Sequence, residues 1–174
     1  MFFLAIAIIG INPFGNRTIA YGDAFNQYFD FFLYYKNVLR GEDSFIYSLS
    51  ARLGQGNLGL FAYYLASPIN LLMCFSDLDN TLLFFNIILA IKISLAATFM
   101  SLFLRNRFKE ELPFFLLLGF SLSYAFMNYD ICQAQNIMWL DGVYLLPLIL
   151  LGVYRVANGQ GRKLLSITVA MSMY

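Results

Sequence analysis

The segment LLFFNIILAIKISLAATFMSLFL, residues 82–104, identifies the class of this protein, because it is long and apolar enough to cross a lipid bilayer. At a rise of about 1.5 Å per residue, a helix of this length spans a hydrocarbon core of about 30 Å. One charged residue, Lys92, lies near its middle. An ammonium group inside a membrane costs about 3 kcal/mol or more unless it faces a partner, a polar cavity or water. We therefore expect Lys92 to be either a functional group or one half of a structural ion pair.

The composition of the whole chain is that of an integral membrane protein. Hydrophobic residues make up 60% of the 174 residues and charged residues only 12%, whereas soluble domains carry about 25% charged residues. The net charge of +1 argues against nucleic acid as a partner, since that would require a clustered basic surface. The chain has no histidine, which excludes His-based triads and most zinc sites. Asp, Glu, Lys, Arg and Tyr are left to carry any chemistry.

The apolar segments predict an all-α fold, a polytopic transmembrane helical bundle. We expect residues 1–174 to be a single partial transmembrane domain, with spans at about 1–12, 82–104, 112–127, 143–157 and 164–174. Residues 13–81 then form an outer loop that contains short interfacial helices. The first and last segments are short for a bilayer, so we expect a longer protein around them.

Basic residues predict which side of the membrane each loop occupies. Three cations lie within residues 105–109, and three more, Arg155, Arg162 and Lys163, lie at or just after the end of the span at 143–157, whereas residues 128–142 contain no Lys or Arg. Basic loops stay in the cytoplasm. The prediction is a bacterial cell-membrane protein with several passes, in which four carboxylates share the extracytoplasmic face: Asp23, Asp30, Asp130 and Asp141.

The segment YGDAFNQYFDFFLYY, residues 21–35, places carboxylates among aromatic residues at the predicted membrane rim. In a helix, the spacing i, i+4, i+7 and i+11 forms one polar stripe, opposite Phe25, Phe29 and Phe32, made of Asp23, Gln27, Asp30 and Tyr34. Such a stripe could line a cleft. The alternative is that Asp23 caps the helix N-terminus and Asp30 is a solvated surface charge.

Two further patterns have a structural interpretation. Residues 54–59, GQGNLG, fit the dinucleotide-binding pattern G-x-G-x-x-G, but the pattern requires a preceding hydrophobic strand in a soluble βαβ unit. We interpret these glycines as sites of close backbone packing between short helices. Trp139 suits a membrane interface, and Asp141 could be an N-cap.

The order of several motifs resembles the YfhO family of bacterial membrane proteins, whose members look like GT-C-type glycosyltransferases. The matching elements cover most of the chain: GDAFNQY at 22–28, LGQGN at 53–57, AYYLASPIN at 62–70, Lys92, SYA at 123–125, NIMWLD at 136–141 and LPL at 146–148.

The resemblance implies an inverting transferase that moves a sugar from a polyprenyl-phosphate donor to an envelope acceptor outside the membrane, such as teichoic or lipoteichoic acid. It places Asp23 as the catalytic base, or as a ligand of a divalent metal ion that assists the reaction; no other cofactor is implied. Arg52 and Lys92 are candidates for neutralising the donor phosphate. The further substrate-binding candidates are Gln27, Tyr28, Tyr63, Tyr64, Asn136, Trp139 and Asp141.

Two other classes of function remain open from the sequence. A transporter or flippase would use Lys92 and the outer acids to line a polar route through the membrane. An envelope assembly protein would have no catalytic activity. The concentration of polar residues in the outer loops, more than in the spans, favours the transferase.

Overall fold

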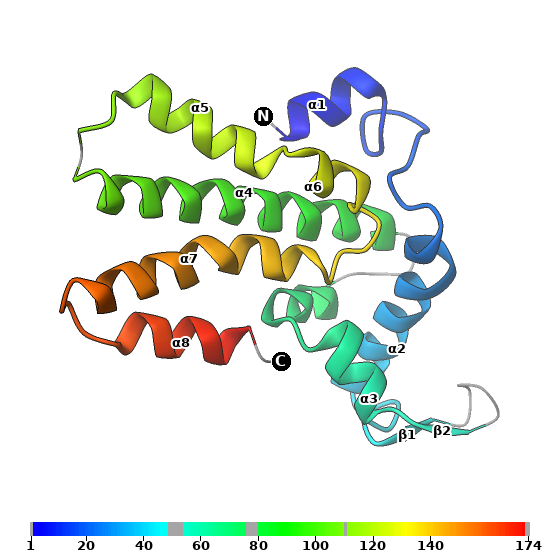
Figure 1. Ribbon diagram of the computed structural model, residues 1–174. Coiled ribbons are helices and arrows are strands. Elements are labelled where there is room, and N and C mark those ends of the chain that lie inside the picture. The colour runs from blue at the N-terminus through cyan, green and yellow to red at the C-terminus, as the bar shows by residue number, and fades with distance from the viewer. Residues whose placement is uncertain (1, 49–53, 76–79, 110, 173–174) are drawn as a thin grey trace. The chain divides into compact units, whose positions relative to one another are not determined.

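The computed structural model describes residues 2–48, 54–75, 80–109 and 111–172 (Figure 1). These residues are mostly helical, and their strands are two short pieces of one hairpin, which confirms the predicted all-α class. Three of the described helical segments are long and apolar enough to cross a membrane: Thr81–Arg107, Phe114–Cys132 and Leu140–Ala157. The chain forms two compact units, unit 1 over Met1–Ile88 and unit 2 over Leu89–Tyr174.

Unit 1 consists of short helical pieces followed by the start of a long helix. Its elements are α1 (Phe2–Ile9), a π-helical turn η1 (Ala24–Tyr28), α2 (Phe29–Leu39), β1 (Tyr47–Ser48), β2 (Gln55–Gly56), α3 (Leu58–Leu60), a second π-helical turn η2 (Phe61–Leu65), the 3₁₀ helix η3 (Pro68–Phe75) and the first turns of α4 (Thr81–Arg107). Pro68 begins η3, as expected for a residue that lacks an N–H and suits the first helical turn.

The π-helical turn η1 changes the face that the acidic segment buries. Ala24, Tyr28 and Phe32 are buried, whereas Asp23 and Asp30 are exposed. Phe25 is 65% exposed, whereas Phe32 is buried and Phe29 half-buried, so the three rings predicted to share one apolar face differ in their burial. A π turn holds more residues than an α turn, and it therefore shifts the helical spacing on which that prediction depended.

The glycine-rich segment forms a hairpin, not a loop between helices. β1 and β2 are antiparallel, with Tyr47 opposite Gly56 and Ser48 opposite Gln55. Gly54 has a φ of +98°, and the Tyr47 hydroxyl occupies the space that a Cβ at this position would need. Gly54 is therefore required by backbone conformation and close packing.

Unit 2 contains the remainder of α4, then α5 (Phe114–Ala125), α6 (Asn128–Cys132), α7 (Leu140–Ala157) and α8 (Lys163–Met171). Lys92 of α4 pairs with Asp141 of α7, and Asn106 of α4 bonds Arg155 of α7. Both contacts join residues 49 positions apart (141 − 92 and 155 − 106). A constant offset of this kind means that α4 and α7 run parallel and in register.

Two details in α7 fix how its neighbours pack. At Gly152, an added Cβ would lie 2.8 Å from the Cα of Leu165, so the missing side chain lets α7 and α8 approach closely. Pro147 lies inside α7, and its missing N–H deprives the Val143 carbonyl of its helical donor. The Tyr124 hydroxyl of α5 donates to that carbonyl at 2.8 Å. A side chain from another helix thus replaces the lost backbone bond, as membrane helices require.

Candidate functional site

The predicted site residues fall into two groups, one in each unit. In unit 1, η1 and η2 bring the side chains of Asp23, Gln27 and Tyr64 together. The Gln27 amide donates from Nε2 to Asp23 Oδ1 at 3.2 Å, and its Oε1 accepts from the Tyr64 hydroxyl at 3.0 Å. Asp23 is exposed, whereas Gln27 and Tyr64 are half-buried. One end of this hydrogen-bonded chain is therefore an accessible carboxylate.

The bonds at Asp23 decide between its two interpretations as far as helix capping is concerned. Asp23 occupies the N-cap position of η1, yet its side chain makes no capping hydrogen bond. Its Oδ1 instead accepts from an amide one turn later in the chain. The capping alternative is therefore wrong for this side chain. Of the predicted polar stripe, the structure shows a contact between Asp23 and Gln27.

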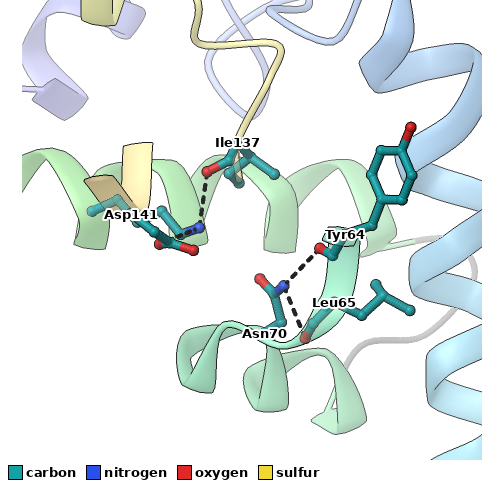
Figure 2. A network of polar contacts seen from close by, with 6 residues as sticks. Tyr64, Leu65, Asn70, Ile137 and Asp141 are labelled. Carbon is teal, nitrogen blue, oxygen red and sulfur yellow. Dashed lines mark hydrogen bonds and ion pairs between the residues drawn. The ribbon is translucent and has the colours of Figure 1, made fainter. Parts of the chain in front are cut away.

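Tyr64 is held from both its ring and its backbone. Its ring contacts those of Tyr28 and Tyr63, with centroid distances of 5.4 Å and 4.7 Å. The buried Asn70 donates to the carbonyls of Tyr64 and Leu65 at 3.3 Å and 3.4 Å (Figure 2). Tyr28 is buried and so packs in the core, whereas Tyr63 is 60% exposed. Of the two, Tyr63 is the ring that a ligand could reach.

In unit 2, Lys92 of α4 is buried and makes two close contacts. Its Nζ lies 2.7 Å from Asp141 Oδ1 and donates to the Ile137 carbonyl at 2.9 Å. Figure 2 shows Ile137 and Asp141, with dashed lines that mark these two contacts. Asp141 belongs to the first turn of α7, whose N-cap is Trp139, so it is not an N-cap. The pair explains how an ammonium group is tolerated within an apolar helix.

The other two candidates of unit 2 lie just before Asp141. Asn136 is buried, and its side chain donates to Gln133 Oε1 at 2.8 Å. Trp139 is 44% exposed, which fits its expected place at a membrane interface. The remaining candidate, Arg52, lies outside the described residues.

The two groups differ in the chemistry that they can support. Asp23 is an accessible carboxylate that can accept a proton or contribute to metal binding, although no cluster of three or more His, Cys, Asp or Glu exists among the described residues. The Lys92 charge is already balanced by Asp141. A donor phosphate at Lys92 would therefore have to compete with an ion pair that is already formed.

Sequence reasoning missed the contacts of Tyr34. Its hydroxyl donates to the Ser44 carbonyl, and Asn57 Nδ2 donates to the same hydroxyl at 2.6 Å. Burial raises the pKa of Tyr34 above its usual value, the Asn57 bond opposes this, and nearby Asp43 adds to it. Asn57 belongs to the LGQGN motif, and that motif was the available signal for this link between α2 and the hairpin.

Asp130 was expected beside Asp23 on one outer face, but its surroundings differ. It is buried, and neither carboxylate oxygen has a hydrogen-bond partner among the described residues. Asp23, in contrast, is exposed and hydrogen-bonded. Asp130 is therefore a weaker candidate for the accessible acid.

Comparison with known families gives a match that covers both groups of residues. The family model described as bacterial membrane protein YfhO matches residues 1–174. Comparisons with curated proteins and with solved structures gave no match. The family match covers every motif discussed above, together with the three helical segments suited to a bilayer. The chain is thus a membrane protein and belongs to the YfhO family.

Proposed function

We propose that this YfhO-family protein takes part in sugar transfer from a polyprenyl-phosphate donor to an acceptor on the extracytoplasmic face, such as teichoic or lipoteichoic acid. The observation that supports this most directly is the exposed Asp23 carboxylate, which accepts a hydrogen bond from Gln27 and through it is linked to Tyr64. A carboxylate held in this way can serve as a general base.

In the proposed reaction, an acceptor hydroxyl oxygen attacks the anomeric carbon of the donor sugar. The bond from this carbon to the phosphate oxygen breaks, and polyprenyl phosphate leaves with the bonding electron pair. Asp23 takes the proton of the attacking hydroxyl, so charge does not build up on the nucleophile. Attack from the face opposite the phosphate inverts the anomeric configuration.

The other candidates have graded support from their surroundings. Tyr63 presents an exposed ring that could stack on a sugar or cover the polyprenyl chain. Arg52 remains the cation proposed for the donor phosphate, since Lys92 is occupied by Asp141. A divalent ion beside Asp23 is a second way to balance the phosphate charge, and removal of metal with a chelator would show its contribution.

The first prediction is that Asp23→Asn abolishes transfer by the intact protein. Asparagine keeps the size of the side chain but cannot take a proton, so the rate should fall by about 10²- to 10⁴-fold. The measurement is transfer of radiolabel from a panel of polyprenyl-phosphate hexoses and N-acetylhexosamines in membranes that contain the protein. The matched control is Asp30→Asn, which alters another exposed acid of the same segment.

The Asp23→Asn variant tests the assignment of the base directly. If Asp23→Asn inserts normally and keeps activity within a few-fold of the parent, the assignment of Asp23 as base fails.

A flippase is the second candidate, because the buried pair of Lys92 and Asp141 is the kind of intramembrane ion pair that marks transport routes. A flippase would move labelled lipid across a vesicle bilayer without any transfer of its sugar.

A further inference from the structure

Cations gather where α4 and α7 end and α8 begins. We call this cluster the basic end; its members are Arg107, Lys109, Arg155, Arg162 and Lys163, of which all but the half-buried Arg155 are exposed. Two contacts hold the helix ends together: Arg155 Nη2 donates to Asn106 Oδ1 at 2.9 Å, and the Arg107 guanidinium lies 5.5 Å from the centre of the Tyr154 ring. The Gln160 N–H donates to the Arg155 carbonyl at 2.8 Å, which turns the chain toward α8.

We propose that the basic end binds the phosphodiester headgroups of anionic phospholipids. The first argument is charge. Within residues 105–112 and 150–163, the sequence carries six Lys and Arg against two acids, Glu110 and Glu111. A cluster of four to eight Lys and Arg at the end of membrane helices is attracted to an anionic lipid surface.

The second argument is that two of the arginines are held in place before any ligand arrives. Arg107 lies over both the Phe108 and the Tyr154 rings, each at 5.5 Å. Arg155 is tied to Asn106. A guanidinium that is already positioned loses less freedom on binding, and its fork of N–H donors matches the oxygens of a phosphate.

The third argument distinguishes a lipid from a soluble anion. Exposed apolar side chains precede the cations within about two helical turns: Leu102 on α4, and Leu150 and Val153 on α7. A phospholipid can place its headgroup against the cations and its acyl chains against these residues at once. A free phosphate or a nucleic acid would use only the cations.

The test compares lipids bound to the full-length protein after extraction from bilayers of equal phosphatidylglycerol and phosphatidylcholine content. Native mass spectrometry reads the ratio of the two lipids retained. For the double variant Arg107→Gln/Lys163→Gln, we expect the preference for phosphatidylglycerol to fall by about fivefold or more. The matched control Arg17→Gln/Arg40→Gln removes two exposed cations of unit 1, and it should keep the parent ratio.

A charge-conserving variant and a competition experiment complete the test. Arg107→Lys/Lys163→Arg keeps both charges, so it should retain most of the preference if the protein is folded. Equal retention of phosphatidylglycerol by the double variant and the parent would overturn the proposal, as would an equal loss in the control. Displacement of the lipid by inorganic phosphate, but not by sodium chloride of the same ionic strength, would indicate a soluble-anion site and also overturn it.

Discussion

The Gln27 side chain connects Asp23 to Tyr64 through two hydrogen bonds. Its amide donates to Asp23 and accepts from Tyr64, because a side-chain amide carries a donor and an acceptor at the same end. An ionised glutamate could not donate, and it would repel Asp23. Gln27 and Tyr64 were predicted to bind substrate, but their observed bonds suit a different hypothesis, in which they orient the acid.

We therefore predict that Tyr64→Phe lowers kcat about threefold to tenfold, with KM changed less than about twofold. The change removes one hydrogen bond, worth about 1 kcal/mol, and frees the Gln27 amide to turn away from Asp23. Steady-state kinetics in the transfer assay provide the measurement. Tyr63→Phe is the control, because its hydroxyl makes no hydrogen bond that the described residues show. A rise in KM with unchanged kcat would instead mean that Tyr64 contacts the substrate.

The sequence could predict the local part of each group but not the distant part. The spacing of Asp23 and Gln27 is one helical turn, and their contact follows from periodicity. The cost of a buried ammonium required a partner for Lys92. Tyr64 and Asp141 lie 37 and 49 positions from the residues that they contact, and no local pattern encodes such distances. Only the packing of separate helices selects these partners.

At the scale of elements, α7 depends on its neighbours at two points. The Val143 carbonyl, which Pro147 leaves without a backbone donor, accepts from the Tyr124 hydroxyl of α5. The first turn of α7 is joined to α4 by the ion pair between Asp141 and Lys92. Each contact satisfies a polar or charged group that water would solvate in a soluble helix. Substitutions at these points should therefore show coupling between helices.

We predict that Tyr124→Phe destabilises the protein by about 1 to 2 kcal/mol, because it leaves the Val143 carbonyl without a donor. In a Pro147→Ala background the same change should cost little, since the N–H gained at position 147 can donate to that carbonyl. Thermal unfolding in detergent of the four proteins of this cycle gives the coupling. Tyr129→Phe, at an exposed position of α6, is the control. Equal costs in both backgrounds would show that Tyr124 does not compensate for the proline.

A second cycle tests the ion pair between α4 and α7. Asp141→Leu leaves a buried ammonium without its partner, so it should destabilise the protein by about 3 to 5 kcal/mol. Adding Lys92→Met should recover most of the lost stability, because well-packed apolar residues can replace a buried ion pair. The unfolding midpoint and the monodisperse fraction in detergent are the readouts. A double variant that is folded but inactive would assign the charges to the reaction or to transport.

At the scale of the whole molecule, the structure and the basic loops constrain topology in different ways. The parallel packing of α4 and α7 puts their basic C-terminal ends on one side of the membrane. It does not say which side, and the charge rule predicts the cytoplasm. The all-α class follows from the long apolar segments, whereas the π-helical turns and the hairpin depend on packing that periodicity does not reveal.

Cysteine labelling can test both statements together. In a background with Cys74→Ser and Cys132→Ser, an impermeant reagent applied to intact cells should modify Asp23→Cys and Trp139→Cys. It should not modify Arg107→Cys or Lys163→Cys. Different labelling of positions 107 and 163 would contradict the parallel arrangement, and labelling of both would invert the topology. All four positions are exposed in the structure, so access by the reagent depends on the side of the membrane.

The paired contacts between α4 and α7 have a mechanical consequence. They lie fourteen residues apart on each helix (106 − 92 and 155 − 141), which is about 21 Å along the axis. A single contact would allow one helix to pivot about it, whereas two contacts at this separation oppose both pivoting and sliding. If the proposed polyprenyl-phosphate donor enters by a movement of the protein, we expect that movement to occur elsewhere than between α4 and α7.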